Sequence, residues 1–205
     1  MKTESDSRDP VARASALIEL FCGLDEFGDL RSVVRSEVPE PARTLLDHRN
    51  HMTVAMERFH GGDVRLRVVA RADDGRGRRP QESGYAREIL LETQLGTIVQ
   101  HGIVRIDLAH LDASTAAAIR EARRPLGRIL IEAGMLRDVN RVQLLQIIPG
   151  PHLQTLLGLA AHPSAGAAAA TPVYGRVAGI DLDGRPAVEL LEIVAPAVHS
   201  AARSE

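Results

Sequence analysis

Apolar residues at helical spacing dominate the first 50 residues of the chain. Asp9 can cap a helix that opens at Pro10, and apolar residues then recur three or four positions apart until Gly23, a plausible end. A second short helix is predicted over about residues 41–48. Residues 1–8 are polar and are predicted to form a disordered tail.

Alternating patterns typical of strands begin after His51. Two pairs of predicted strands are joined by two-residue hairpin turns, Gly61-Gly62 and Asp183-Gly184. The predicted strands are short, and apolar and polar residues alternate along them. They span residues 53–60, 63–71, 85–93, 97–107, 141–148, 172–182 and 186–195. A polar loop, residues 72–84, separates the first pair from the next.

Two more helices are predicted between these strands. Asp112 is the expected cap of a helix over 113–122, and Pro125 opens a short helix that ends near Gly134. Residues 149–171 are expected to form a short helical turn and then a flexible connection.

The strands outnumber the helices, and most are joined by hairpins. This pattern favours an α+β fold in which one antiparallel sheet carries flanking helices. A chain of 205 residues fits one domain of ordinary size, and we expect that domain to span 9–196, followed by a polar tail over 197–205.

Composition adds few constraints. The net charge of −2 gives no electrostatic reason to expect nucleic acid or an anionic membrane as a partner. The single cysteine, Cys22, excludes an intrachain disulfide and is predicted to fill core space rather than to react. No signal peptide and no apolar run of about 20 residues is present, so a cytoplasmic protein without membrane contact is expected.

An arginine lies within the apolar pattern of the strand Tyr85-Ala86-Arg87-Glu88-Ile89-Leu90-Leu91. Because side chains alternate along a strand, Arg87 shares a face with Tyr85 and Ile89. A buried guanidinium needs an anion, and its planar fork suits a carboxylate. Arg87 is therefore a candidate anchor for a ligand carboxylate; an internal salt bridge, or a head group that reaches solvent, is the alternative.

Two glutamates lie on the last predicted strand. Glu192 shares a face with Val188 and Val194, whereas Glu189 points to the other face. A carboxyl in an apolar pocket has a raised pKa and can act as a general acid or base. Alternation does not say which face is buried, and one or both glutamates can equally be solvated.

The sequence shows no motif for metal binding, nucleophilic catalysis or nucleotide binding. His48 and His51 lie three residues apart, but no third metal ligand is placed beside them, so no metal is expected. The sequence contains no nucleophile elbow, P-loop or dinucleotide-binding fingerprint. No cofactor is therefore expected.

Four short segments, taken together, resemble the chorismate lyase family. They are His51-Met52-Thr53, the strand around Arg87, Arg124-Pro125-Leu126-Gly127-Arg128-Ile129-Leu130, and Gly184-Arg185-Pro186 followed by Glu192-Ile193-Val194-Ala195-Pro196. Each is weak alone, but they occur in the order found in the family and together span residues 51–196.

The resemblance implies a fold and a set of residue roles. The fold is one antiparallel sheet of about six strands, with helices on one side and loops closing over an internal site. Arg87 falls on the arginine that binds a substrate carboxylate, and Glu192 on the catalytic glutamate. Met52 and Leu126, with the adjacent Gly127, fall on positions whose backbone groups bind ligand.

The sequence also departs from the family pattern. Ile103 occupies the position of a second family arginine, and Arg105, two residues further on and on the same face, is the nearest substitute. Arg176 matches a Gly-Arg pair that recurs in the family and is a weaker candidate for substrate binding. The 149–171 segment is longer than its family counterpart, which can alter a lid.

The resemblance implies a monomeric, cofactor-free lyase that converts chorismate to 4-hydroxybenzoate and pyruvate. Either quinone synthesis or secondary metabolism can use the product, and basic residues that are almost all arginine lean towards secondary metabolism. Two alternatives remain open. One is an enzyme on the same scaffold that acts on another hydroxybenzoate or carboxylate. The other is a non-catalytic small-molecule-binding domain, as in some transcription regulators; the residues before His51 look too few and insufficiently basic for a DNA-binding helix-turn-helix.

Overall fold

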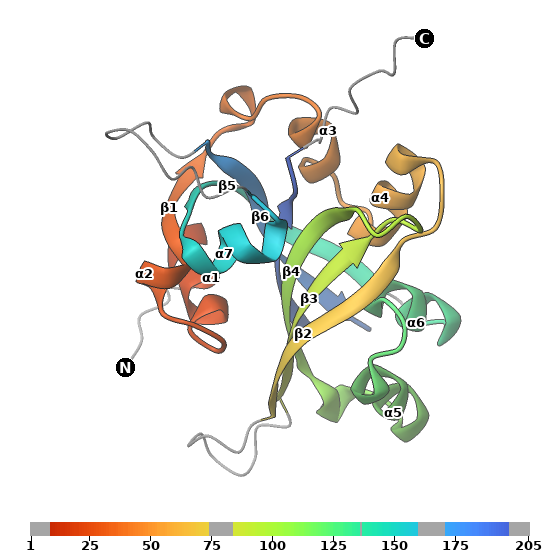
Figure 1. The fold of residues 1–205 in the computed structure, drawn as a ribbon. Coiled ribbons are helices and arrows are strands. Elements are labelled where there is room, and N and C mark those ends of the chain that lie inside the picture. The colour runs from red at the N-terminus through yellow and green to blue at the C-terminus, as the bar shows by residue number, and fades with distance from the viewer. Residues whose placement is uncertain (1–8, 74–83, 136, 160–170, 197–205) are drawn as a thin grey trace, which may run out of the picture.

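The structure is a computed structural model, and it describes residues 9–73, 84–135, 137–159 and 171–196. Seven strands form one antiparallel sheet in the order β1-β5-β6-β7-β4-β3-β2 (Figure 1). The strands are β1 (Gly28–Val33), β2 (Arg65–Asp73), β3 (Gly84–Glu92), β4 (Ile98–Asp107), β5 (Arg137–Pro149), β6 (Val173–Leu182) and β7 (Arg185–Val194). The predicted α+β class, with one antiparallel sheet and flanking helices, is confirmed.

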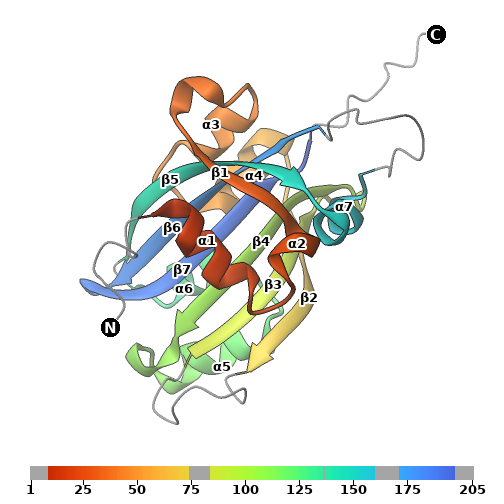
Figure 2. The same ribbon diagram turned by 90° about the vertical axis from the view of Figure 1, so that its left-hand side faces the viewer.

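Helices cover both faces of the sheet, not one as the family resemblance implied. On one face lie α1 (Pro10–Ile18), α2 (Leu24–Phe27) and α7 (Pro151–Leu157), with α1 crossing the strands in Figure 2. The other face carries α3 (Ala42–Leu46), α4 (Met52–His60), α5 (Ala113–Glu121) and α6 (Leu126–Glu132). Two short 3-10 turns, Arg35–Glu37 and Leu108–His110, complete the described elements.

Residues 53–60 form helix α4, so the predicted strand and its hairpin at Gly61-Gly62 are wrong. Met52 and Met56 lie four positions apart, and both are buried, which is the spacing of one helix face. Gly61 ends the helix with a φ of 70°, a left-handed conformation that glycine adopts without strain. Tertiary burial of the two methionines thus overrides the β-like alternation.

Strand β1 was not predicted, and it explains why the sheet has more strands than the family resemblance implied. Its residues are mostly exposed because it forms one edge of the sheet, so its sequence lacks a buried face. β1 pairs with β5, which begins at Arg137 instead of the predicted 141. The loss of one predicted strand and the gain of β1 leave the number of strands at seven.

The other predicted elements are close to their observed positions. The β3–β4 and β6–β7 hairpins, helix α5 with its Asp112 cap, and helix α6 match the sequence pattern within a few residues. Part of the predicted connection over 149–171, the tails at 1–8 and 197–205, and most of the loop over 72–84 lie outside the described residues.

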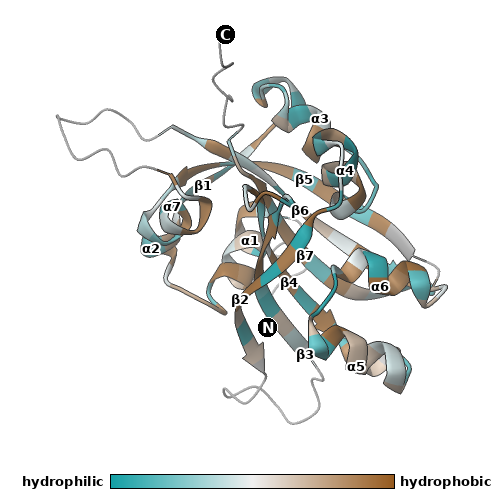
Figure 3. Cartoon of the chain, turned by 45° about the vertical axis from the view of Figure 1, so that its right-hand side comes forward, coloured by the Kyte–Doolittle hydropathy of each residue, from teal (hydrophilic) through white to brown (hydrophobic). Residues whose placement is uncertain are grey.

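The core has an apolar layer on each face of the sheet, and hydrophobic and hydrophilic positions alternate along its strands (Figure 3). Cys22 packs against the layer beneath α1, and burial raises the pKa of its thiol to about 11, as suits a residue that fills space. Six buried polar or charged side chains lie on four of the five inner strands of the sheet: Arg87, Glu88, Gln100, His101, Arg176 and Glu192. In the described parts of the chain, no helix is both long enough and apolar enough to cross a membrane.

Candidate ligand-binding site

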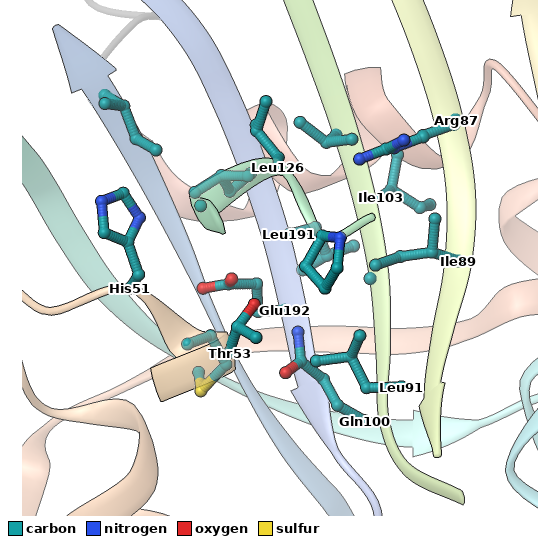
Figure 4. A pocket seen from close by; sticks show the side chains of 17 residues that line it. His51, Thr53, Arg87, Ile89, Leu91, Gln100, Ile103, Leu126, Leu191 and Glu192 are labelled. Carbon is teal, nitrogen blue, oxygen red and sulfur yellow. The ribbon is translucent and has the colours of Figure 1, made fainter. Parts of the chain in front are cut away.

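A pocket lies between the sheet and the segments that precede α4 and α6 (Figure 4). Its volume is about 50 Å³, several times the ~10–15 Å³ that one water molecule needs. The strands β3, β4 and β7 supply its floor, which includes Arg87, Ile89, Gln100, Gly102, Leu190 and Glu192. The opposite wall includes His51, Met52, Thr53, Pro125, Leu126 and Gly127.

Arg87 is the most unusual side chain of this pocket. Only 1% of it is exposed, yet no carboxylate of the described residues pairs with it, and its Nε has no hydrogen-bond partner there. Its one hydrogen bond within the described residues is long, 3.4 Å from Nη1 to the carbonyl oxygen of Ile119. Burial lowers the pKa of the guanidinium because the charged form loses its hydration. Arg87 is therefore a buried cation without a compensating anion in the described chain.

The surroundings of Arg87 strengthen the demand for an anion. Arg71 on β2 is its direct cross-strand neighbour and places a second positive charge beside it. The Tyr85 hydroxyl, two residues away on the same strand face, is also buried and has no partner among the described residues. An incoming carboxylate would offer acceptor oxygens to the guanidinium of Arg87 and to the Tyr85 hydroxyl, which can donate as well as accept.

Glu192, at the other end of the floor, is paired with a buried arginine. The Nε of Arg176 donates to its Oε2 over 2.7 Å, and Arg176 is only 1% exposed. Tyr174, Arg176 and Glu192 share this face because Arg176 and Glu192 are register partners on β6 and β7. Glu192 is thus a carboxylate whose charge is compensated by Arg176.

Arg176 also holds the chain that leads into the pocket wall. Its Nη1 donates to the carbonyl oxygens of Leu46 (3.3 Å) and His48 (2.7 Å), and its Nη2 donates to that of Asn50 (3.2 Å). These bonds fix the loop between α3 and α4, and therefore the position of Met52. Arg176 is not among the residues that line the pocket; it acts behind Glu192 as a structural anchor.

His48, in the same loop, contacts Arg176 and has a lowered pKa. Its Nδ1 accepts a hydrogen bond from the backbone N–H of Asn50 (3.1 Å) and lies 3.2 Å from Nη1 of Arg176. Burial, and then the charge of Arg176, lower the pKa of His48.

The lowered pKa of His48 predicts a loss of stability as the pH falls. Below about pH 6.5 the unfolded chain binds a proton at His48 before the folded chain does, so the free energy of unfolding decreases. A His48→Gln variant cannot take up that proton, and we expect its stability to fall less between pH 7.5 and pH 5.5 in urea titrations. Parallel pH dependences for the two proteins would contradict this assignment.

Two glycines shape the pocket. A Cβ on Gly102 would lie 3.3 Å from a side-chain carbon of Ile89, so glycine keeps the floor open at mid-length. A Cβ on Gly127 would lie 3.1 Å from the ring of His51, so glycine lets the start of α6 approach the segment before α4. The Gly127 predicted as a backbone ligand site is thereby placed on the wall of the pocket.

The structure gathers most, but not all, of the predicted site residues. One pocket is lined by Arg87, Glu192, Met52, Leu126 and Gly127. The segment His51–Thr53 contributes to it from the start of helix α4, and not from a strand as predicted. Their roles in binding stay predictions.

Arg105 is not among the residues that line the pocket. It points to the opposite face of β4, where its Nε donates to Oε2 of Glu189 over 2.9 Å, and both side chains are about one third exposed. The side chain of Ile103 shares that face with Arg105, as the alternation predicted, and packs in the apolar layer beneath α1, although Ile103 still borders the pocket.

Gln100 lines the pocket but was not predicted as a site residue from the sequence. Its face on β4 also carries Val104 and Ile106, so the alternation that singled out Arg87 could have found it. An uncharged side chain gives a weaker signal than an arginine, because burying an amide is less costly than burying a charge.

A second buried polar group lies on the opposite face of the sheet. Oε1 of Glu88 is 2.9 Å from Nε2 of His101 and 2.9 Å from Nε2 of His152 on α7. Burial alone would raise the pKa of Glu88, but the hydrogen bonds and charge interactions with the two imidazoles outweigh it and hold the pKa below its ordinary value. Within the described residues, no three His, Cys, Asp or Glu side chains are grouped so that they could hold a metal ion.

Comparison with known proteins finds no matching family and no matching curated protein. Solved structures do match. The effector domain of PhnF from Mycobacterium smegmatis is 16% identical over 71% of this chain and 88% of that chain, with a TM-score of 0.47. The C-terminal domain of the histidine utilization repressor from Pseudomonas syringae pv. tomato str. DC3000 is 13% identical over 69% of this chain and 96% of that chain, with a TM-score of 0.46. A GntR-family transcriptional regulator from Bacillus cereus is 14% identical over 66% of this chain and 93% of that chain, with a TM-score of 0.44.

These comparisons correct the function expected from the sequence. The matching structures are parts of transcriptional regulators, not lyases, so the predicted lyase with its chorismate, 4-hydroxybenzoate and pyruvate chemistry is wrong. The expectation of no nucleic-acid partner is wrong on the same comparison. At these identities and TM-scores the likeness concerns the fold alone and transfers no residue roles.

Proposed function

We propose that this chain is a non-catalytic domain that binds a small monocarboxylate in the pocket, with the carboxylate on Arg87. The observation that carries the proposal is the guanidinium of Arg87, which is buried in the pocket without an anion among the described residues. An uncompensated buried charge is strongly unfavourable, and a ligand carboxylate bound through two parallel hydrogen bonds would compensate it.

The charge of the pocket favours a single negative charge on the ligand. Glu192 and Arg176 form an ion pair and cancel each other, so Arg87 carries the uncompensated positive charge of the pocket lining, with Arg71 beside it on β2 outside the lining. The middle of the pocket is apolar, with Ile89 and Leu190 on the floor and Leu126 on the wall. A compact apolar body with one carboxylate suits this arrangement.

Paired titrations of benzoate and benzamide test the proposal. Both probes have the same shape, but only benzoate carries the charge that Arg87 lacks, so we expect calorimetry to detect binding of benzoate alone. An Arg87→Met variant should bind benzoate at least ~30-fold more weakly, because losing one partner of a buried charge pair costs about 2–5 kcal/mol. Benzoate recovered from the complex should be chemically unchanged.

Arg105→Met is the matched control, because this arginine lies on the opposite face and is partly exposed. It should bind benzoate as the wild type does. Failure of a set of aromatic and aliphatic monocarboxylates to bind, or equal binding of benzoate by the wild type and Arg87→Met, would contradict the proposal.

The same substitution should have the opposite effect on the unliganded protein. Methionine fits an apolar environment without needing an anion, so Arg87→Met should raise the free energy of unfolding by about 1–3 kcal/mol. Urea unfolding of the two proteins without ligand measures the difference. A variant less stable than the wild type would mean that Arg87 is already compensated within the protein.

A further inference from the structure

Gln100 is a buried polar side chain of the pocket that the Arg87 site does not use. Only 2% of it is exposed, and its Oε1 has no hydrogen-bond partner among the described residues. Rotation of the terminal amide by half a turn exchanges its oxygen and nitrogen, so the group as a whole can accept or donate. An unpaired buried amide is unfavourable in the empty pocket, and a ligand group that pairs with it would remove that cost.

The end of the pocket around Gln100 holds a carboxylate, Glu192, and a hydroxyl, Thr53. Figure 4 shows Gln100, Thr53 and Glu192 turned toward one another from β4, α4 and β7. Gln100 and Glu192 are diagonal neighbours on the same sheet face, since Glu192 pairs with Gly102, two residues from Gln100. A carboxylate accepts only, so a ligand that reaches this end meets Glu192 best with a hydrogen-bond donor.

This end of the pocket also disfavours a second charge on the ligand. The charge of Glu192 is already balanced by Arg176, so a cation would find no free anion and a second ligand carboxylate would face Glu192 directly. An uncharged donor, such as a hydroxyl, avoids both conflicts.

Gln100 and Arg87 lie at opposite ends of the pocket floor. Arg87 pairs with Val104, and Gln100 lies four residues from Val104 along β4, which separates the two backbone positions by about 13 Å. Side chains from both ends shorten that span, and Gly102 leaves the middle open. The remaining length suits one ring or a short chain between two polar ends.

We propose that Gln100 determines the specificity of the pocket by selecting monocarboxylates that carry an uncharged hydrogen-bond donor at the end opposite the carboxylate. The inference rests on the proposed binding of the carboxylate at Arg87. It adds the second recognition point and so names the class of ligand.

Three probes of similar shape test Gln100: 4-methylbenzoate, 4-(hydroxymethyl)benzoate and terephthalate. At the end opposite the anchored carboxylate, the first probe carries an apolar methyl group, the second a hydroxyl that can donate a hydrogen bond, and the third a negatively charged carboxylate. We expect wild-type protein to bind the hydroxymethyl acid about tenfold more tightly than the methyl acid, which is the effect of one good hydrogen bond. Terephthalate should bind more weakly than both because its second carboxylate faces Glu192.

A Gln100→Met variant keeps the length of the side chain but removes the amide. It should lose the roughly tenfold preference for the hydroxymethyl acid, while it still binds the methyl acid, which shows that the pocket is folded. Suppose that benzoate binds through Arg87 but the wild type shows no preference for the hydroxymethyl acid over the methyl acid, or that Gln100→Met weakens the binding of both acids equally. Either result refutes the role of Gln100 and leaves the Arg87 site supported. If neither benzoate nor any of the three acids binds, the proposed function itself fails.

Discussion

Replacing Arg176 with methionine is expected to lower the free energy of unfolding by about 3–5 kcal/mol, because it leaves the buried carboxylate of Glu192 without its partner. The side chain of Arg176 is 1% exposed and bonds to Glu192 and to three carbonyl oxygens of the 46–50 loop. Methionine fills much of the same space, so the loss reports the ion pair and the loop contacts and not a large cavity. Urea unfolding at neutral pH measures the difference.

Arg105→Met is the matched control for this prediction. Arg105 is also an arginine paired with a glutamate of β7, but 36% of its side chain and 35% of that of Glu189 are exposed. Exposed pairs contribute about 0–1 kcal/mol, so this variant should be close to the wild type. If the free energy of unfolding decreased by similar amounts in the two variants, burial of the Arg176 ion pair would not explain its contribution to stability.

Replacing Glu88 with alanine is expected to destabilise the fold by about 3–5 kcal/mol, because two imidazoles lose the acceptor they share. His101 is fully buried, and its Nδ1 already lacks a partner among the described residues, so removal of Glu88 leaves both ring nitrogens unpaired there. His152 loses the contact that ties α7 to the central strands. Phe27 packs against both imidazole rings and cannot replace the hydrogen bonds.

The effect of Glu88→Ala should depend on pH in a defined direction. The folded-state pKa of Glu88 is lowered, so its contribution is complete above the unfolded value of about 4.3 and is lost as the pH falls through the folded value. The stability difference between wild type and variant should therefore shrink in acid. Glu189→Ala, on a partly exposed pair, is the control and should lose little at any pH. A difference that grows in acid would contradict the lowered pKa.

The sequence predicts the inner sheet better than its edges. The hairpins β3–β4 and β6–β7 have strong alternation because one face of each strand meets an apolar layer. β1 is an edge strand with few buried residues, so its pattern carries little information. Helix α4 was predicted as a strand because only two of its positions, Met52 and Met56, are buried, too few to give a clear helical period.

The candidate site was predictable where charge and apolar pattern conflict. Arg87 and Glu192 interrupt apolar strands, and both line the pocket. The partner of Glu192 was not predictable, because the pairing of Arg176 with it depends on the neighbouring positions of β6 and β7 in the sheet. The position of Arg105 outside the pocket lining has a different cause: alternation placed it on the face of Ile103, but nothing in the local sequence tells which face holds the pocket.

The most direct test of the central claim is the NMR signal of the Arg87 Nε–H group during a titration with benzoate. The signal is assigned as the one that disappears in Arg87→Met. Because this Nε has no partner in the described chain, we predict a large shift that saturates with the affinity measured by calorimetry. Saturable binding of benzoate that leaves the Arg87 signal unmoved would contradict the account.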